Sequence, residues 1–337
     1  MSRTVYINGE FVPESEAKLS IYDLSVMQAA AAFEMTRSFN GVHFKLREHL
    51  LRLEQSCKLL SIPMPCEVEY LEGICYEVSS RNDHGPGEEH RLLIVVSPGC
   101  APMYRDLAGV IPHPFLYIAD FPLRYTVQGF SKYFTEGVHC VTSNIQQVPD
   151  ACIPSQAKHR SRLHFHLAQH QATAGTWPIM TTMNWQRWDQ LGTGKFTALP
   201  EGRKSVITEA PGANICLVRG ACIHIGQRNV LRGISAQTVS EICVPEYIGV
   251  SHARDWTTLD DAQSADELWL TGTPFCMLPV VSLDGKPIGN GTIGPVYTET
   301  LRKWSALVGV DIAQQIIDWD TPSPLWTPEA QRKCSAV

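Results

Sequence analysis

The stretch VPDACIPSQAKHRSRL, residues 148–163, guides the interpretation of the whole sequence. It contains a single lysine, Lys158, and we expect a helix to begin close to that residue. An isolated lysine is more often a solvated surface residue than part of a functional site. The stretch therefore carries meaning only in combination with other segments of the chain.

The composition is that of an ordinary globular protein. The chain has 337 residues, of which 44% are apolar and 18% charged, a length that suggests two domains or one large domain. The net charge of −6 gives no reason to expect nucleic acid or a membrane surface as a partner. Eleven cysteines without a CxxC pair favour reduced thiols. Since no signal-peptide pattern is present and the apolar run 26–33 is too short to span a bilayer, we expect a cytoplasmic protein.

Local patterns predict a mixture of strands and helices. Three turn pairs, Asn8-Gly9, Asn40-Gly41 and Asp284-Gly285, lie between short apolar runs and predict hairpins. Apolar spacings of three and four predict a helix over 46–60, and a second apolar face predicts one over 297–308. Apolar runs predict strands at 91–96, 137–142, 215–218 and 268–270. The elements do not alternate regularly, so the predicted fold class is α+β.

Two familiar motifs do not fit their usual functions. Residues 289–294 read GNGTIG, which matches the dinucleotide fingerprint, but they follow a hairpin tip instead of a buried strand. We interpret them as a glycine-rich turn. His166 and His170 are four residues apart, yet no glutamate follows His166 as in HExxH and no third ligand is evident nearby. We interpret these side chains as solvated helix residues and predict no metal site.

Four further stretches, two of them glycine-containing turns, are to be considered together with the lysine stretch. Residues 206–215, VITEAPGANI, place Glu209 ahead of a predicted strand that begins near Asn214. Residues 47–53, REHLLRL, hold Arg52, whose guanidinium fork suits a phosphate. RGIS, residues 232–235, and LTGTP, residues 270–274, combine glycine with hydroxyl side chains, as phosphate-binding turns do. Each segment alone has a bland explanation as an exposed turn or a surface helix.

Taken in order, these segments resemble the fold-type IV, or class IV, pyridoxal-phosphate-dependent aminotransferases of the branched-chain and D-amino-acid type. The resemblance covers nearly the whole chain, from Tyr6 to about Asp311. It implies that Lys158 carries pyridoxal 5′-phosphate as a Schiff base and acts as the catalytic base. It also implies that Glu209 faces the pyridine nitrogen, which it keeps protonated. The other expected cofactor-binding residues are Arg52, Asn214, Ile234, Ser235 and Thr273.

The same resemblance implies a two-domain architecture. We expect a small N-terminal α/β domain over residues 1–126 and a large cofactor-binding domain with a barrel-like sheet over 127–320. A crossover over 121–128 joins the two, and residues 321–337 form a polar, proline-containing tail. A homodimer is expected by resemblance alone.

The sequence departs from the family pattern on the substrate side. Phe33 and Gln28 belong to the expected pocket segment, where relatives often have an aromatic residue at the position of Gln28. Met103 stands where the D-amino-acid enzymes have a carboxylate-binding arginine, which leaves Arg105 and Arg91 as substitutes. In addition, Lys158 and Glu209 are 51 positions apart, an interval lengthened by residues 176–203.

The predicted function is transfer of an amino group from an amino acid to a 2-oxo acid, with branched-chain substrates as the first choice. The alternatives are a D-amino-acid or amine transaminase and a lyase similar to aminodeoxychorismate lyase. A cofactor-free binding protein on the same scaffold is a further alternative, which the joint presence of Lys158, Glu209 and Arg52 disfavours. The sequence leaves the substrate stereochemistry and the amino acceptor open.

Overall fold

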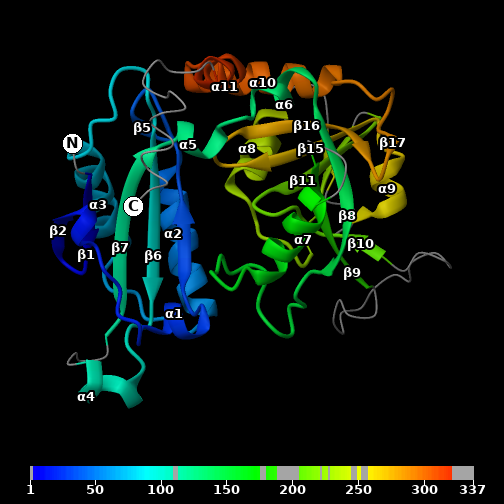
Figure 1. Ribbon diagram of the computed structural model, residues 1–337. Helices are drawn as coiled ribbons and strands as arrows, with labels where there is room; N and C mark the ends of the chain where they lie inside the picture. Colours follow the sequence, from blue (N-terminus) through cyan, green and yellow to red (C-terminus); the bar gives the residue numbers. More distant parts are fainter. Residues whose placement is uncertain are drawn as a thin grey trace.

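The computed structural model describes residues 3–108, 113–174, 180–187, 205–220, 222–226, 228–243, 249–251 and 257–320. Two separate sheets divide the molecule into a small half, built on the first 122 residues, and a larger half. In Figure 1 the small half is blue to cyan, and the larger half runs from green to orange.

The strands follow one another along the chain with these bounds: β1 Thr4–Ile7, β2 Glu10–Pro13, β3 Ala32–Met35, β4 Ser38–Phe39, β5 Val42–His43, β6 His90–Ser97, β7 Phe115–Pro122, β8 Val138–Gln146, β9 Met180–Arg187, β10 Ser205–Ile207, β11 Asn214–Arg219, β12 Cys222–Ile225, β13 Gly249–Ser251, β14 Thr257–Thr258, β15 Glu267–Gly272, β16 Cys276–Leu283 and β17 Lys286–Pro287.

The helices are α1 Leu24–Gln28, α2 Leu46–Leu59, α3 Val68–Ser80, α4 Arg105–Ala108, α5 Arg124–Val127, α6 Ser131–Thr135, α7 Leu163–Ala174, α8 Ile234–Cys243, α9 Leu259–Gln263, α10 Pro295–Val308 and α11 Ile312–Asp320. Two short 3-10 helices, η1 Glu14–Glu16 and η2 Pro102–Tyr104, complete the set.

The small half is an antiparallel sheet with the strand order β2-β1-β7-β6-β3. Because successive strand residues point to opposite faces, β6 sends Leu92, Ile94 and Val96 into a core shared with α2 and α3. Its other face carries Val95, which packs with Phe33 in a smaller apolar cluster. This second face is the one on which Lys158 lies, as described below.

The larger half is a mixed sheet with the order β13-β12-β11-β15-β16-β8-β9-β10-β14. Its central strands β15 and β16 are buried along almost their whole length, as strands covered on both faces are. Helix α8 and helices α10 and α11 pack on this sheet and add Trp304 to its core. Because the described pairings form an open path, the barrel-like closure of this sheet stays a prediction.

The two halves are joined by the segment after β7 and by a buried arginine. Short helices α5 and α6 follow Pro122 and lead into β8. Arg37, only 1% exposed, reaches from the small half to the carbonyl of Pro274 at 3.1 Å and to Gln315 Oε1 at 2.8 Å. The predicted boundaries after residues 126 and 320 stay predictions, and the predicted tail lies outside the described residues.

Most local expectations are confirmed. The three Asn-Gly and Asp-Gly turns form the hairpins β1–β2, β4–β5 and β16–β17, and the predicted helices and strands appear within a few residues of their expected bounds. The GNGTIG run is a turn before α10, as interpreted. Gly294 is required there because an added Cβ would lie 2.0 Å from Cδ of Glu267, whose carboxylate accepts the first backbone N–H groups of α10.

No helix among the described residues combines the length and the apolar character needed to cross a lipid bilayer.

Candidate active site

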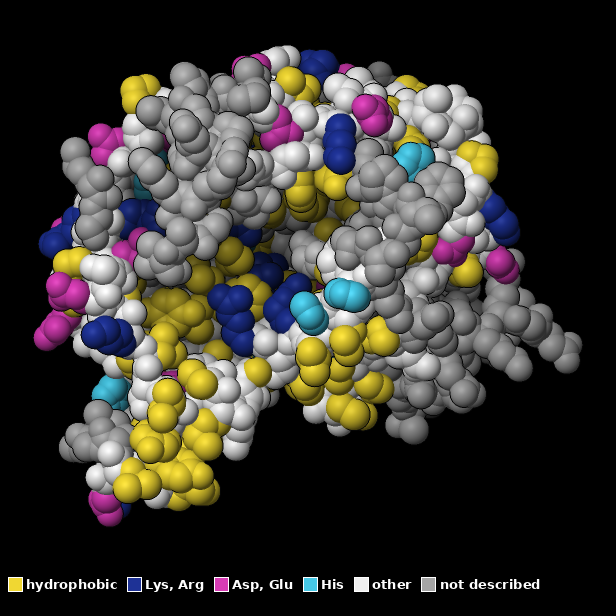
Figure 2. Space-filling view, viewed as in Figure 1, with side chains coloured by type: hydrophobic (Ala, Val, Ile, Leu, Met, Phe, Trp, Pro, Cys, Tyr) yellow, Lys and Arg dark blue, Asp and Glu magenta, His cyan; other side chains and the backbone are white. Residues whose placement is uncertain are grey.

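A pocket lies between the two halves, lined by Arg52 of the small half and by residues of the larger half. Figure 2 shows Lys and Arg side chains gathered in the hollow at the middle of the molecule, with two histidines beside them. All seven residues predicted to bind the cofactor line this pocket: Arg52, Lys158, Glu209, Asn214, Ile234, Ser235 and Thr273.

Lys158 is held by backbone contacts with the small half. Its carbonyl accepts from Phe33 N at 3.0 Å, its own N–H donates to Ser56 Oγ at 3.0 Å, and Arg160 N donates to the carbonyl of Ala31. The segment thus runs along β3, and α7 begins at Leu163, five residues after the lysine. Burial lowers the pKa of the Lys158 amine to about 7. The amine is therefore poised to be neutral, and so nucleophilic and basic, close to neutral pH.

Glu209 lies in the same pocket and is only 8% exposed. Its carboxylate accepts from Gln147 Nε2 at 3.0 Å and, at 3.4 Å, from the N–H of Leu231. Burial raises the pKa of this carboxyl to about 7. The protein alone therefore does not fully stabilise the charge on Glu209, and a cationic group brought into the pocket would do so.

Arg52 projects from α2 and is fixed by Glu34. Its Nε and Nη2 donate to the two oxygens of Glu34 at 2.6 and 2.9 Å, a fork-to-fork pair, and its Nη1 donates to the carbonyl of Arg232 at 2.9 Å. His49 Nδ1 lies 2.7 Å from the same carboxylate. Burial alone would raise the pKa of Glu34, but Arg52 and His49 hold it well below its usual range. Arg52 is thus oriented in advance at the edge of the pocket.

The two glycine-containing turns both line the pocket, and the first of them lies beside Arg52. Helix α8 begins at Ile234, so its first free N–H groups and Ser235 face the pocket, an arrangement that binds phosphate in many proteins. Gly233 permits this approach, because an added Cβ would lie 1.8 Å from Oδ1 of Asn214. Asn214 in turn donates to the carbonyl of Leu231 at 2.7 Å. Thr273 follows the end of β15 and lines the same pocket.

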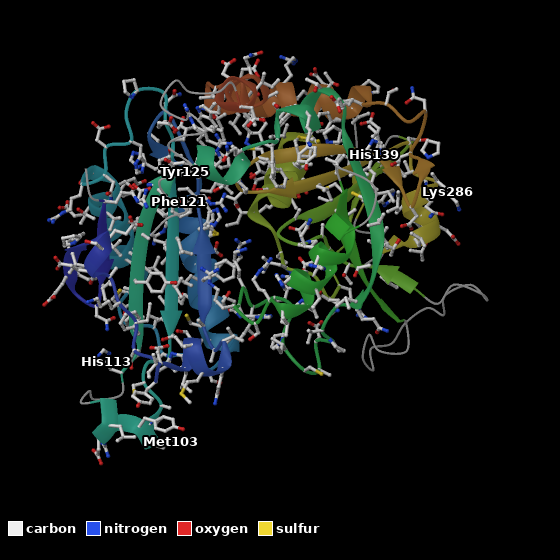
Figure 3. All side chains as sticks on the ribbon, in the orientation of Figure 1. Met103, His113, Phe121, Tyr125, His139 and Lys286 are labelled. Carbon is white, nitrogen blue, oxygen red and sulfur yellow. The ribbon has the colours of Figure 1, made fainter. Side chains whose placement is uncertain are left out.

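The predicted substrate-side residues are scattered more widely. The ring of Phe33 lies 4.9 Å from Lys158 Nζ, beside the pocket. Gln28 is exposed at the end of α1, and Arg105, whose side chain is 62% exposed, lies on α4. This helix belongs to a lobe that projects away from the pocket, marked by Met103 in Figure 3. Neither Gln28 nor Arg105 lines the pocket of the single chain.

Arg91 is buried on β6, where its Nη2 contacts Met35 Sδ at 3.3 Å. Its Nε and Nη1 have no hydrogen-bond partner among the described residues. Burial, with some repulsion from Arg37, lowers its pKa to about 9. Arg91 does not line the pocket either, and the substrate-binding role of Arg91 and Arg105 stays a prediction.

Arg162 is a pocket residue to which the sequence assigned no role. It lines the pocket, and its guanidinium lies over the rings of Phe165 at 4.6 Å and Phe33 at 5.8 Å. Within the described residues this guanidinium makes no hydrogen bond or ion pair, unlike Arg52. Arg160 stacks over Phe33 at 4.1 Å. Both arginines stand in the quoted stretch 148–163, where the basic pattern after Lys158 was the available signal.

Comparisons with known proteins agree with this geometry. The family model described as amino-transferase class IV matches residues 31–283. A putative branched-chain-amino-acid aminotransferase of Methanocaldococcus jannaschii is 25% identical, over 89% of this chain and 94% of the relative. A D-alanine aminotransferase of Bacillus licheniformis is also 25% identical, over 87% of this chain and 92% of the relative.

Solved structures show the same fold. The T.th. branched-chain amino acid aminotransferase, complexed with N-(5′-phosphopyridoxyl)-L-glutamate, superposes with a TM-score of 0.73 at 25% identity, over 92% of this chain and 95% of that one. The Escherichia coli branched-chain enzyme gives a TM-score of 0.75 at 21% identity, over 92% and 94% of the two chains. The fold is therefore that of the fold-type IV enzymes.

The chain belongs to the class IV aminotransferase family. It is a pyridoxal-phosphate-dependent aminotransferase that transaminates amino acids.

The residues present fit this cofactor. Gln147 Oε1, Ser155 Oγ and His159 Nδ1 are buried pocket-lining atoms without hydrogen-bond partners in the described part of the chain, so the pocket offers polar groups to a ligand. The buried amine of Lys158 suits the aldehyde of the cofactor, and the buried carboxyl of Glu209 suits its ring nitrogen. The glycine turn at the start of α8 suits its phosphate.

Proposed function

We propose that Lys158 binds pyridoxal 5′-phosphate covalently and that the enzyme transfers the amino group of an apolar, branched-chain-like amino acid to a 2-oxo acid. The observation that carries the proposal is the convergence of Lys158, Glu209, Arg52 and the start of α8 on one pocket. These groups come from segments far apart in the sequence, and they offer one partner for each functional part of the cofactor.

The protein residues divide the work as follows. When bound, the cofactor supplies an aldehyde for the amino group and a ring that accepts electrons. Glu209 holds a proton on the ring nitrogen, and Arg52 and the N-terminus of α8 bind the phosphate. Lys158 Nζ would take the proton from the α-carbon of the amino donor and pass it to the aldehyde-derived carbon of the cofactor, a task suited to its lowered pKa.

The first prediction concerns the lysine. Borohydride reduction of the holoenzyme followed by peptide mapping should place the label on Lys158. Lys158→Ala should lose both the cofactor absorbance band and turnover, and Lys18→Ala, which removes an exposed lysine, serves as a control that keeps the label on Lys158. A label on another residue, or normal transamination by Lys158→Ala, would contradict the proposed role.

We also propose that Arg162 binds the substrate carboxylate. Its guanidinium lines the pocket and has its hydrogen-bonding groups available within the described structure. Burial lowers its pKa, but an arginine remains charged at neutral pH. A carboxylate would therefore meet a positioned cation that has lost part of its hydration.

The second prediction follows from this contact. Arg162→Gln should raise KM for the amino donor by about 10-fold or more, the value of one charge-assisted hydrogen bond, and leave the cofactor absorbance unchanged. Arg105→Gln is the matched control, since its side chain is exposed on α4. An unchanged KM in Arg162→Gln would rule out the contact.

A second candidate substrate class is D-amino acids, because the D-alanine aminotransferase relative is as similar as the branched-chain one. A screen of single half-reactions with L- and D-amino acids, read from the cofactor absorbance, decides between them. Conversion with a D-series donor alone would replace the branched-chain proposal.

We expect a homodimer and a cytoplasmic location. Supporting the dimer, the lobe around α4 exposes Met103 by 80% and Leu107 by 73%, and Figure 2 shows hydrophobic side chains gathered on that lobe. Apolar residues grouped in this way are typical of contact surfaces. Sedimentation equilibrium tests the dimer, and a monomer at micromolar concentration would exclude it.

A further inference from the structure

We propose that His84, His90 and Asp120 form a divalent-metal site of the zinc type in the small half of the protein. The three residues are the one group of His, Cys, Asp and Glu side chains with metal-ligand spacing among the described residues. Their ligand atoms all lie within 4.8 Å of one another. The site is separate from the pocket and plays no part in the proposed transamination.

The sheet itself places two of the ligands. Leu92 of β6 pairs with Asp120 of β7, so His90, two residues before Leu92, lies on the same face as Asp120. That face also carries Leu92 and Ile118, which pack under α2 and α3. Phe33, beside Lys158, belongs to the cluster on the other face. The site therefore lies on the far side of the sheet from the pocket.

A short turn brings the third ligand back to the sheet. After α3 ends, Gly85 and Gly87 adopt positive φ values of 92° and 76°, which glycine reaches without strain. The turn lays the imidazole of His84 against that of His90, with ring centroids 4.8 Å apart. The end of β7, where Asp120 lies, is marked by the adjacent Phe121 in Figure 3.

Two buried atoms in this cluster fall short of full hydrogen bonding among the described residues, although one of them, His84 Nε2, is within ion-pair distance of Asp120. His84 Nε2 lies 3.3 Å from Asp120 Oδ2 without forming a hydrogen bond, and Asp120 Oδ1 has no partner at all within the described residues. The side chain of Asp120 is fully buried and that of His84 is 5% exposed. Unsatisfied buried polar atoms are rare, and a bound ion is one of the few reasons for them.

The ligand set indicates the metal. Two imidazole nitrogens and one carboxylate suit zinc, whereas magnesium and calcium prefer oxygen ligands alone. Zinc bonds of about 2.1 Å in a tetrahedron separate neighbouring ligand atoms by about 3.4 Å. The His84–Asp120 distance of 3.3 Å already matches. His90 Nδ1 lies 2.6 Å from Asp120 Oδ2, so this distance must lengthen by less than about 1 Å when zinc binds. A water molecule would occupy the fourth ligand position.

A metal here would stabilise the junction between the two halves. The turn that holds His84 continues into Glu88, which pairs with Arg124 at 2.6 Å, and Gly87, whose carbonyl accepts from Trp319 Nε1 of α11 at 3.2 Å. Leu123 N, just after β7, donates to the carbonyl of Glu89. Fixing the turn to β7 therefore also fixes the start of the crossover and the docking of α11.

The test measures zinc binding directly on the full-length holoenzyme. After removal of metal with a chelator, the protein is titrated with Zn²⁺ in competition with a chromophoric indicator, and with Co²⁺ for its absorption spectrum. We expect one tightly bound zinc per chain and a tetrahedral Co²⁺ spectrum without thiolate charge-transfer bands. Zinc should also raise the Tm of the holoenzyme.

Matched variants locate the metal. His84→Gln and Asp120→Asn should each weaken zinc binding by at least about 100-fold, since losing a mere supporting hydrogen bond already costs metal sites about 10–100-fold. His166→Gln/His170→Gln, which alters two exposed histidines of α7, should bind zinc as the wild type does. Circular dichroism verifies folding, and His84→Gln, in the turn after α3, decides the matter if Asp120→Asn does not fold.

Three results would overturn the site: less than one zinc bound at micromolar concentration, unchanged affinity in His84→Gln, or thiolate bands in the Co²⁺ spectrum, which would place the metal at a cysteine. None of these readouts uses transamination, so failure of the metal site and failure of the proposed function are distinguished.

Discussion

At the scale of single residues, the active pocket contains two groups whose charged forms are costly without a ligand. Lys158 and Glu209 both have a pKa near 7, one lowered and one raised by burial. Strongly shifted pKa values of a lysine and a carboxyl in one pocket are typical of functional sites. The cofactor supplies what each lacks, a carbon for the amine and a cation for the acid.

The third prediction concerns Glu209 in the cofactor-free protein. Its carboxyl has a pKa of about 7 when folded, against an ordinary value of 4.5. Between these values the folded chain holds a proton that the unfolded chain has lost, so stability falls as pH rises through this window. Glutamine does not ionise, so the free energy of unfolding of Glu209→Gln should not fall in this way. Above pH 7 the variant should be more stable than the wild type by up to about 3 kcal/mol.

Urea unfolding at pH 5 and pH 8 measures this difference, which should be much smaller at pH 5. The same variant should bind pyridoxal 5′-phosphate more weakly, because it has no charge to offer the ring nitrogen. A variant that is equally stable at pH 8 and binds the cofactor normally would show that Glu209 faces neither a low-dielectric site nor the ring.

At the scale of secondary-structure elements, glycines decide how closely backbones approach the pocket. Gly233 lies one residue before α8, where Asn214 at the start of β11 leaves no room for a side chain. The side chain of Asn214 also fixes the carbonyl of Leu231. The turn and the helix start are therefore one unit, and the phosphate-binding N–H groups depend on it.

The fourth prediction tests this unit. Gly233→Ala should displace Asn214 and weaken cofactor binding by about 10-fold or more, the equivalent of one charge-assisted hydrogen bond, as measured by titration with pyridoxal 5′-phosphate. Gly73→Ala is the control, because nothing lies within 4 Å of an added Cβ in α3, and it should be neutral or slightly stabilising. Equal cofactor affinity in the two variants would argue against the crowded turn.

At the scale of the whole molecule, Arg37 is one of the buried polar links between the halves. It is buried, stacks over Phe39 at 3.8 Å and donates to groups of the larger half. Since the pocket is lined from both halves, their relative position affects the distance between Arg52 and the start of α8. Arg37 therefore influences the site without touching it.

The fifth prediction concerns this link. Arg37→Ala leaves the carbonyl of Pro274 and the side chain of Gln315 without their donors, and it should lower the free energy of unfolding by about 3 kcal/mol. Arg302→Ala, which removes an exposed pair with Glu299 on α10, should have no measurable effect. Urea titration followed by circular dichroism provides the comparison, and equal midpoints would contradict a structural role for Arg37.

Much of the local structure was predictable because its causes are local. Short-range sequence patterns specify the Asn-Gly and Asp-Gly turns, the apolar face of α2 and the buried strands β6 and β15. The family resemblance also placed the seven cofactor-side residues, all of which line one pocket. The role of each remains a prediction until it is tested.

The substrate side was not predictable in the same way. Arg162 belongs to the lysine stretch, but its sequence context gives it no assigned role, whereas Arg105 is a sequence candidate that lies on a projecting lobe. Which arginine reaches the pocket depends on how the segment after Lys158 runs along β3. That path is fixed by hydrogen bonds to Ala31 and Phe33, more than a hundred residues away.

The sequence by itself determined the family, the hairpins and the main helices, and it predicted a set of residues to hold the cofactor, because motif order and short-range periodicity are properties of the chain. Only the tertiary structure decided which charges share a pocket and which histidines meet Asp120. The physical reason is that burial and charge pairing, which set the pKa of Lys158 and Glu209, arise only when distant segments exclude water together.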